Sequence, residues 1–182
     1  AGSLQVLRLP YSKINDSIVE QAAPRLSTVT FLDLSYCPKI GAQAIEAIGK
    51  HCKILVTLCR NTYFLYSAGT DEPEDEANAI AATMPGLKHL ELGSHNISTE
   101  CVLNIIFSCP QLEHLDINGC FTVNRDFKFF KEKYPKLKIV GPDEEKEFKE
   151  IEKLNFTIID QDLYDDDFFE SMMEEIAMEL AK

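Results

Sequence analysis

Aliphatic residues recur along this chain with a fixed spacing, and this repeat limits the folds it can adopt more than any other feature. Each copy follows the pattern L-x-x-L-x-L, and the copies begin 25, 26, 32, 25 and 25 residues apart. The third copy is degraded, because Arg60 stands where an apolar residue is expected, and the sixth is cut short. A constant period with a constant internal pattern is typical of stacked repeats. The copies begin at Leu4, Val29, Leu55, Leu87, Leu112 and Leu137.

Each copy predicts one strand followed by one helix. Alternate side chains of a strand share a face, so the last two leucines of each pattern point into a core. Apolar residues three or four apart follow most strands and predict a helix with an apolar face. One such unit cannot bury enough surface alone, so neighbours must stack. The predicted helical positions are Ile14, Ile18 and Ala22, then Ile40, Ala44, Ile45 and Ile48, then Ala77, Ile80 and Ala81, then Cys101, Val102, Ile105 and Ile106, and finally Val123, Phe127 and Phe130.

The predicted fold is therefore an α/β leucine-rich-repeat solenoid of about five repeats over residues 1–142. A curved parallel sheet would line its concave side, and helices would cover the convex side. Residues 143–182 break the pattern and form a separate acidic, amphipathic C-terminal extension. Because Leu4, Leu7 and Leu9 already follow the repeat pattern, we expect a longer protein with further repeats or a cap before Ala1.

Side chains on the outward face of the strands are the candidate partner-binding residues, since the concave face of a solenoid is its usual binding surface. In-register strands would place His89 beside His114 and Glu91 beside Asp116, about 5 Å apart. The alternative is that any solvated strand face needs polar residues. The predicted lattice is Arg8, then Phe31, Asp33 and Ser35, then Thr57 and Asn61, then His89 and Glu91, and finally His114, Asp116 and Asn118.

The two histidines and two carboxylates also suit zinc. However, the four-residue sequence His-Leu-acid-aliphatic occurs in both repeats, and duplication of the repeat explains the paired residues without a metal. We therefore expect no metal and no cofactor.

The third repeat carries about seven extra residues after its strand, within residues 61–73. Insertions in solenoids map to loops on one face, often the binding face. Tyr63, Phe64 and Tyr66 are aromatic types enriched at interfaces, and they are further candidate partner-binding residues. Packing of these rings on the rim of the solenoid is the alternative. Residues 74–84 then predict a helix.

The C-terminal extension carries most of the charge. Residues 143–182 hold 15 acidic and 4 basic residues, whereas residues 1–142 hold 15 and 14. An acidic tail disfavours nucleic-acid binding and favours a basic partner. Its last segment has helical apolar spacing, which predicts docking on the chain itself or on a partner, with disorder as the alternative. The docking candidates are Phe168, Phe169, Met172, Met173, Ile176 and Leu180.

The six cysteines form no C-x-x-C pair, so a zinc ribbon or a redox motif is not indicated. We expect reduced thiols that serve as small buried apolar groups. No apolar run is long enough for a membrane span, and the chain does not open on a signal peptide. The expected location is intracellular, in the nucleus or the cytoplasm, with no membrane partner.

The cysteine positions carry a family resemblance. The stretch from Cys109-Pro110 through Cys120 to Val123 follows C-P-x-L-x-x-L-x-L-x-x-C-x-x-V, and Leu32 to Ile40 is a second close match. This resembles the cysteine-containing class of leucine-rich repeats and, over residues 4–141, the repeat region of plant F-box/leucine-rich-repeat proteins. The resemblance implies a substrate receptor of an SCF-type ubiquitin ligase in the ubiquitin conjugation pathway. No F-box is found in this chain, so contact with the ligase adaptor would need an upstream segment.

No nucleophile motif, phosphate-binding loop or H-E-x-x-H motif occurs, so we do not expect an enzyme. The leading hypothesis is a protein-binding substrate-recognition domain. One alternative is an acidic-tailed chaperone or adaptor for basic proteins, unrelated to ubiquitination, and another is a scaffold without a ligase link.

Overall fold

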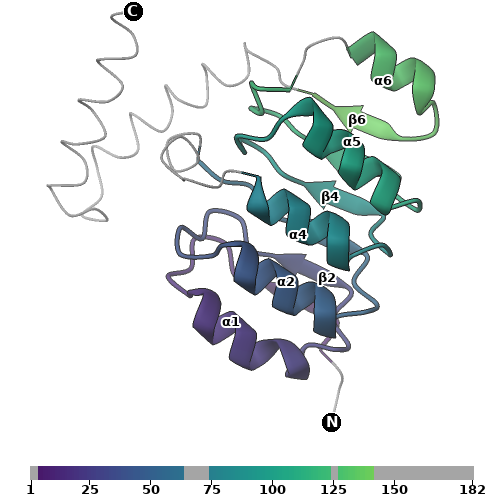
Figure 1. The fold of residues 1–182 in the computed structure, drawn as a ribbon. Coiled ribbons are helices and arrows are strands. Elements are labelled where there is room, and N and C mark those ends of the chain that lie inside the picture. The colour runs from purple at the N-terminus through teal and green to yellow at the C-terminus, as the bar shows by residue number, and fades with distance from the viewer. Residues whose placement is uncertain (1–3, 64–73, 124–126, 142–182) are drawn as a thin grey trace, which may run out of the picture. The chain divides into compact units, whose positions relative to one another are not determined.

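The structure, a computed structural model, describes residues 4–63, 74–123 and 127–141, and these fold as consecutive strand–helix units. The described strands form one parallel sheet in the order of the sequence, and the helices stack in a second layer on one face of it (Figure 1). This confirms the predicted leucine-rich-repeat solenoid. The strands are β1 (Val6–Arg8), β2 (Phe31–Asp33), β3 (Thr57–Cys59), β4 (His89–Glu91), β5 (His114–Asp116) and β6 (Lys138–Val140). The helices are α1 (Asp16–Ala22), the 3₁₀ turn η1 (Ala23–Arg25), α2 (Ala42–His51), α4 (Asp75–Thr83), α5 (Thr99–Ser108) and α6 (Phe127–Lys133).

The middle residue of each strand points into the core, as the leucine pattern predicts. These residues lie opposite one another across the sheet, and those of β2 to β5 are at most 1% exposed. The extra residues of the third repeat do not disturb this register, because Leu58 still pairs with Leu90. The aligned middle residues are Leu7, Leu32, Leu58, Leu90, Leu115 and Ile139.

The sixth strand departs from the spacing of the repeat. The sequence pattern aligns Val140 with Leu115, but the structure pairs Ile139 with Leu115 and Val140 with Asp116. A one-residue slip reverses which side chains face the core. The observed register turns Lys138 away from the core and packs Ile139 against it.

The helices contribute the other half of the core, and the buried faces of α2, α4 and α5 agree with the sequence, whereas that of the first repeat does not. In α4 and α5 the buried residues are those predicted. In the first repeat Ile18 is 52% exposed and Val19 is buried instead. The reason is that Asn15 caps α1 by accepting a hydrogen bond from the Ile18 backbone N–H at 3.1 Å. This places Ile14 before the helix and turns Val19 inward.

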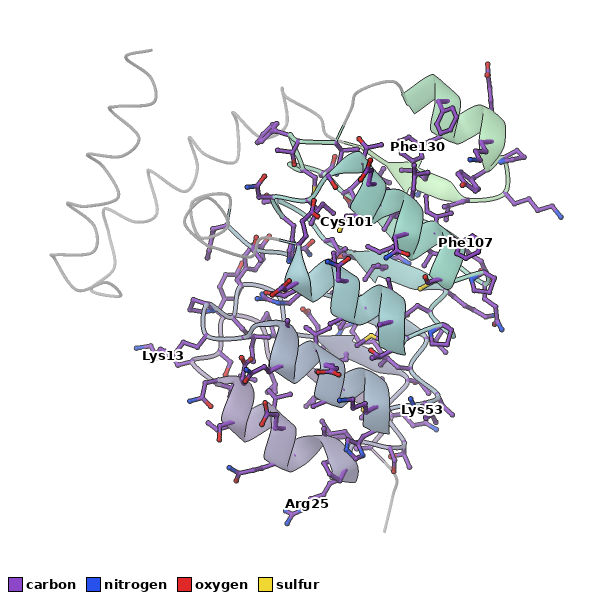
Figure 2. The ribbon with its side chains drawn as sticks, viewed as in Figure 1. Lys13, Arg25, Lys53, Cys101, Phe107 and Phe130 are labelled. Carbon is purple, nitrogen blue, oxygen red and sulfur yellow. The ribbon has the colours of Figure 1, made fainter. Side chains whose placement is uncertain are left out.

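Helices α2 and α4 approach closely at Gly49. A Cβ atom at this position would lie 1.9 Å from the Thr83 Oγ1 atom, so only glycine fits without a shift. The outer surface of the helical layer is mostly polar. Figure 2 shows Phe107 at the end of α5, directed away from the body and 85% exposed, whereas Phe130 of α6 is buried.

All six cysteines are free and buried, as expected for reduced thiols that fill the core. Four of them also donate to a neighbouring repeat, and the bonds from Cys109 to the Met84 carbonyl oxygen and from Cys101 to Asn78 Oδ1 are 3.4 and 3.6 Å long. The thiol of Cys37 donates to the Leu9 carbonyl oxygen at 3.1 Å, and that of Cys120 donates to the Leu92 carbonyl oxygen at the same distance. The cysteines that follow β2 and β5 therefore each satisfy a backbone acceptor of the preceding repeat. No helix in the described part of the chain is long and apolar enough to cross a membrane.

Candidate functional site

The strand residues that point away from the helices form two rows, which together we call the open face. The structure places each predicted strand residue of the lattice on this face and adds four residues outside that lattice, Val6, Cys59, Lys138 and Val140. The first row is Val6, Phe31, Thr57, His89, His114 and Lys138; the second is Arg8, Asp33, Cys59, Glu91, Asp116 and Val140.

The two histidines of the first row stack face to face. Their ring centroids are 4.2 Å apart, and the planes differ by 1°. The Nε2 atom of His89 lies 3.1 Å from the Glu91 Oε1 atom, within hydrogen-bond distance. Burial lowers the pKa of His114, and the positive charges of a protonated His89 and of Lys138 lower it further. The neutral ring of His114 is thus favoured, which suits a flat stacking surface.

A hydrogen-bonded chain continues from this stack across three repeats. Asn61 Nδ2 donates to Glu91 Oε2 at 3.0 Å and to Ser35 Oγ at 3.3 Å, and its Oδ1 atom accepts from the Gly93 N–H at 2.8 Å. A Cβ atom at Gly93 would lie 2.7 Å from that Oδ1 atom, so glycine is needed beside Asn61. Burial raises the pKa of Glu91, but the bonds from Asn61 and His89 outweigh it, and the net pKa is lowered. Glu91 therefore stays ionised.

Two aspartates of the second row use one carboxylate oxygen each to hold the chain at the end of their strands. Asp33 Oδ1 accepts from the Ser35 N–H at 3.0 Å, and Asp116 Oδ1 accepts from the Asn118 N–H at 2.9 Å. Asn118, the last residue of the predicted lattice, is thus held just after the end of β5. The second oxygen of each aspartate accepts no hydrogen bond from the described residues. These two oxygens and the ionised Glu91 give the centre of the open face its negative charge.

Aromatic rings cover the end of the open face near the first repeat. The guanidinium carbon of Arg8 lies 4.6 Å from the centre of the Phe31 ring. Beyond the strand ends, Tyr11 stacks on Tyr36 with centroids 4.8 Å apart, and Tyr36 contacts Tyr63 at the same distance. We call these three residues the tyrosine ladder. The sequence reading singled out only Tyr63 of the three.

Backbone strain accompanies the ladder. Tyr11 and Tyr36 have φ values of 60° and 59°, in the left-handed region that Gly119 occupies in the fifth repeat. Non-glycine residues in this region cost of order 1 kcal/mol and are kept where other contacts fix them.

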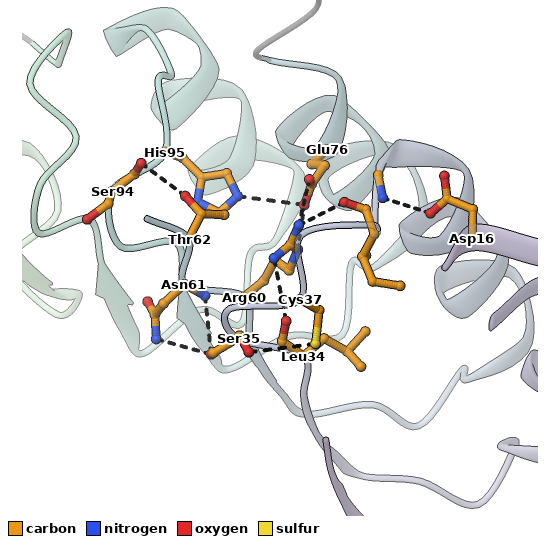
Figure 3. A network of polar contacts seen from close by, with 12 residues as sticks. Asp16, Leu34, Ser35, Cys37, Arg60, Asn61, Thr62, Glu76, Ser94 and His95 are labelled. Carbon is orange, nitrogen blue, oxygen red and sulfur yellow. Dashed lines mark hydrogen bonds and ion pairs between the residues drawn. The ribbon is translucent and has the colours of Figure 1, made fainter. Parts of the chain in front are cut away.

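Behind the open face lies a salt bridge with a neighbouring histidine that the repeat pattern does not predict (Figure 3). The Arg60 guanidinium binds both carboxylate oxygens of Glu76, at 2.8 and 3.0 Å, and donates to the Ile40 carbonyl oxygen at 2.9 Å. The His95 Nε2 atom lies 3.6 Å from Glu76 Oε2. We call Arg60, Glu76 and His95 the ion cluster; Arg60 and His95 are buried, and Glu76 is 18% exposed. Burial opposes ionisation of Glu76, but the His95 imidazole and the Arg60 charge prevail and lower its pKa.

Two signals in the sequence point to this cluster. Arg60 stands at an apolar position of the repeat, and His95 stands at the position that Cys37 and Cys120 occupy in their own repeats. Arg60 alone was interpreted as a departure from the pattern, and His95 was not singled out. Their shared partner, Glu76, is separated from Arg60 by the insertion, so no local spacing connects them.

The described thiols are poorly suited to nucleophilic chemistry. Burial, with nearby Glu91 and Asp33, raises the pKa of Cys59 to about 12, and burial with Glu74 raises that of Cys101 to about 12. Thiolate is the reactive form, so both remain inert at neutral pH. The described residues contain no group of three or more histidine, cysteine or carboxylate side chains arranged to hold a metal ion.

The remaining candidates lie outside the described residues. These are Phe64 and Tyr66 of the insertion and the docking residues of the extension, Phe168, Phe169, Met172, Met173, Ile176 and Leu180. The boundary at residue 142 and the binding roles of the lattice stay predictions.

Known proteins share this repeat region. A family model described as "Leucine Rich repeat" matches residues 25–49. F-box protein FBW2 of Arabidopsis thaliana is 54% identical over 142 residues, which are 78% of this chain and 45% of that protein. Putative F-box/LRR-repeat protein 23 of the same plant is 34% identical over 61% of this chain and 24% of its own length. F-box protein SKIP19 is 33% identical over 76% of this chain and 43% of its own length. The chain thus spans less than half the length of these curated relatives.

Proposed function

We propose that this chain, whose leucine-rich repeats match the repeat region of a plant F-box protein, is the substrate-recognition part of an F-box subunit of a ubiquitin ligase. The observation that carries the proposal is the 54% identity to an F-box protein over 78% of the chain. In this role the chain binds a protein and performs no chemistry itself. The adaptor of the ligase would bind an F-box elsewhere in the longer protein. The site of action would be the nucleus or the cytoplasm.

The open face is the proposed contact with the substrate. Its polar groups are already held in place, because Asn61 fixes Glu91 and Glu91 lies within hydrogen-bond distance of His89. Groups held in one arrangement before binding lose less entropy when a partner arrives. The rim residue Tyr63 extends the same surface.

The proposal is tested by co-purification. The full-length protein, expressed with a tag in plant cells under proteasome inhibition, should carry the cullin-ligase adaptor and at least one protein that accumulates under the inhibitor. Absence of the adaptor from cross-linked complexes would sink the ligase role.

A pair of variants separates substrate contact from ligase assembly. The double substitution His89→Ser and His114→Ser removes the stacked rings of the open face and should release the substrate while the adaptor stays bound. His51→Ser alters an exposed histidine on the helical layer and should change neither. Retention of the substrate by the double variant would move the binding surface away from the open face.

A further inference from the structure

We infer that the partner of the open face is an extended protein segment carrying two basic side chains four residues apart. This inference rests on the proposed function and adds the chemistry of the substrate. It follows from the charge of the face, from the rings at its end and from the spacing of the strands.

The charge of the face is arranged as an acidic centre between two basic ends. We call Asp33, Glu91 and Asp116 the acidic row; they lie on β2, β4 and β5. Arg8 ends this row on β1, and Lys138 lies near its other end, on β6 but in the neighbouring first row. Before the strands, Lys88 and Glu113 face each other at 3.5 Å and leave no net charge. A partner laid across the strands therefore meets negative charge in the middle and positive charge at both ends.

The carboxylates of the acidic row are held in place and only partly used by the chain. Asp33 and Asp116 each keep one oxygen without a hydrogen bond from the described residues, and neither side chain is buried. Glu91 is 30% exposed and stays ionised. Charge-assisted hydrogen bonds from lysine or arginine are the strong complement to such oxygens.

The aromatic rings favour the same chemistry independently. The faces of aromatic rings attract lysine and arginine, and Arg8 over Phe31 is an instance within this face. The tyrosine ladder adds further ring surface beyond the ends of β1 to β3, with Tyr11 66% exposed.

The strand spacing sets the distance between the two basic side chains. Neighbouring strands lie about 4.8 Å apart, so Asp33 is about 10 Å from Glu91, and Asp116 lies about 5 Å further along. One cation at Asp33 and another between Glu91 and Asp116 would thus be about 12 Å apart. In an extended segment, side chains at positions i and i+4 point to the same side and are about 13 Å apart.

The same charges argue against two other occupants. The extension, residues 143–182, carries a net charge of −11 in its sequence, so the acidic row would repel it. A nucleic acid would be repelled in the same way.

The test uses the full chain and end-blocked nonapeptides of glycine, serine and threonine that contain two arginines. Isothermal titration at low ionic strength compares arginines four positions apart with adjacent arginines and with glutamates. We expect the first peptide to bind about threefold more tightly than the second and the acidic peptide not to bind.

Two triple variants with equal change in charge locate the site. Asp33→Asn, Glu91→Gln and Asp116→Asn keep the shape and the capping oxygens of the acidic row but remove its charge, and should weaken binding at least tenfold. Glu20→Gln, Glu46→Gln and Glu100→Gln remove three exposed charges from the helices and should change the affinity less than twofold. If the first triple variant fails to fold, Asp33→Asn with Asp116→Asn replaces it, with a loss of at least threefold expected.

Equal weakening by the two triple variants, or none by the first, overturns the inference. These outcomes leave the proposed function intact, because co-purified substrate and adaptor would still report it. Loss of the adaptor in that experiment would instead remove the proposed function, whatever the peptides do.

Discussion

Two neighbouring interfaces of the solenoid use equivalent positions with different chemistry. Between the third and fourth repeats, the residue after the strand is Arg60 and the turn residue facing it is His95. Between the fourth and fifth repeats, the same places hold Leu92 and Cys120, with the thiol donating to the Leu92 carbonyl oxygen. All four residues are less than 5% exposed.

The comparison shows how a position that usually holds leucine can hold a charged residue. The strand pairing is the same at both interfaces, since β3, β4 and β5 keep one register. Arg60 is accommodated because Glu76 binds it at two points and the Ile40 carbonyl takes a further donor. A buried pair of this kind is about as stable as an apolar pair, but it tolerates the loss of one member poorly.

The largest effect is expected from breaking the ionic interface. Arg60→Ala would leave Glu76, which is 18% exposed, without its two bonds to the guanidinium, and should lower the free energy of unfolding by about 2–3 kcal/mol. Urea denaturation followed by circular dichroism measures the change. Arg25→Ala, at an exposed arginine, serves as control and should change it by less than about 0.5 kcal/mol. A loss below about 1 kcal/mol for Arg60→Ala would show that water solvates Glu76 well enough to replace the guanidinium.

A smaller effect is expected at the thiol interface. Cys120→Ala removes one donor to a buried carbonyl and the volume of one sulfur atom, without leaving a charge behind. We expect a loss of about 1–2 kcal/mol in the same urea assay. Equal losses for Arg60→Ala and Cys120→Ala would abolish the distinction between the two interfaces.

Lowering the pH should reduce the gap in stability, that is, the difference in the free energy of unfolding between the natural chain and the Arg60→Ala variant. The pKa of Glu76 is below its usual 4.5 in the folded chain, so its stabilisation is present above pH 4.5 and is lost as the pH falls through the folded value. Urea titrations at several pH values between 7 and 3 measure the gap. The gap caused by Cys120→Ala should stay constant, because thiols remain protonated in this range. An Arg60→Ala gap that is constant with pH would show that Glu76 does not titrate with the cluster.

The smallest effect is expected from converting one interface into the other. The triple substitution Arg60→Leu, Glu76→Ala and His95→Cys replaces the three side chains of the ion cluster by residue types that other repeats bury. Its free energy of unfolding should lie within about 1 kcal/mol of that of the natural chain, or above it. A loss greater than about 2 kcal/mol would mean that the ion cluster stabilises the fold more than an apolar interface does.

The same contrast explains what could be predicted from the sequence. The strands, the sheet order and the His89–His114 stack follow from a repeat in which each leucine specifies one inward position. The places where the structure departs from the repeat depend on three-dimensional contacts, which the spacing of the leucines does not specify. Arg60 finds Glu76 only in three dimensions, and the Asn15 cap rotates α1 so that Val19 replaces Ile18. The tyrosine ladder was missed because two of its members hold left-handed turns, where the pattern predicts no preferred side chain.

The continuous register across the third repeat has a consequence for how this repeat region can vary in sequence. Thr57 pairs with His89 as directly as His89 pairs with His114, although 32 residues separate the first pair and 25 the second. The pairing of the strands thus does not depend on the length of the segment that follows β3. That segment can be lengthened, shortened or exchanged between paralogues while every other strand keeps its neighbours. Grafting a foreign loop at residues 64–73 is consequently the engineering route that leaves the scaffold intact.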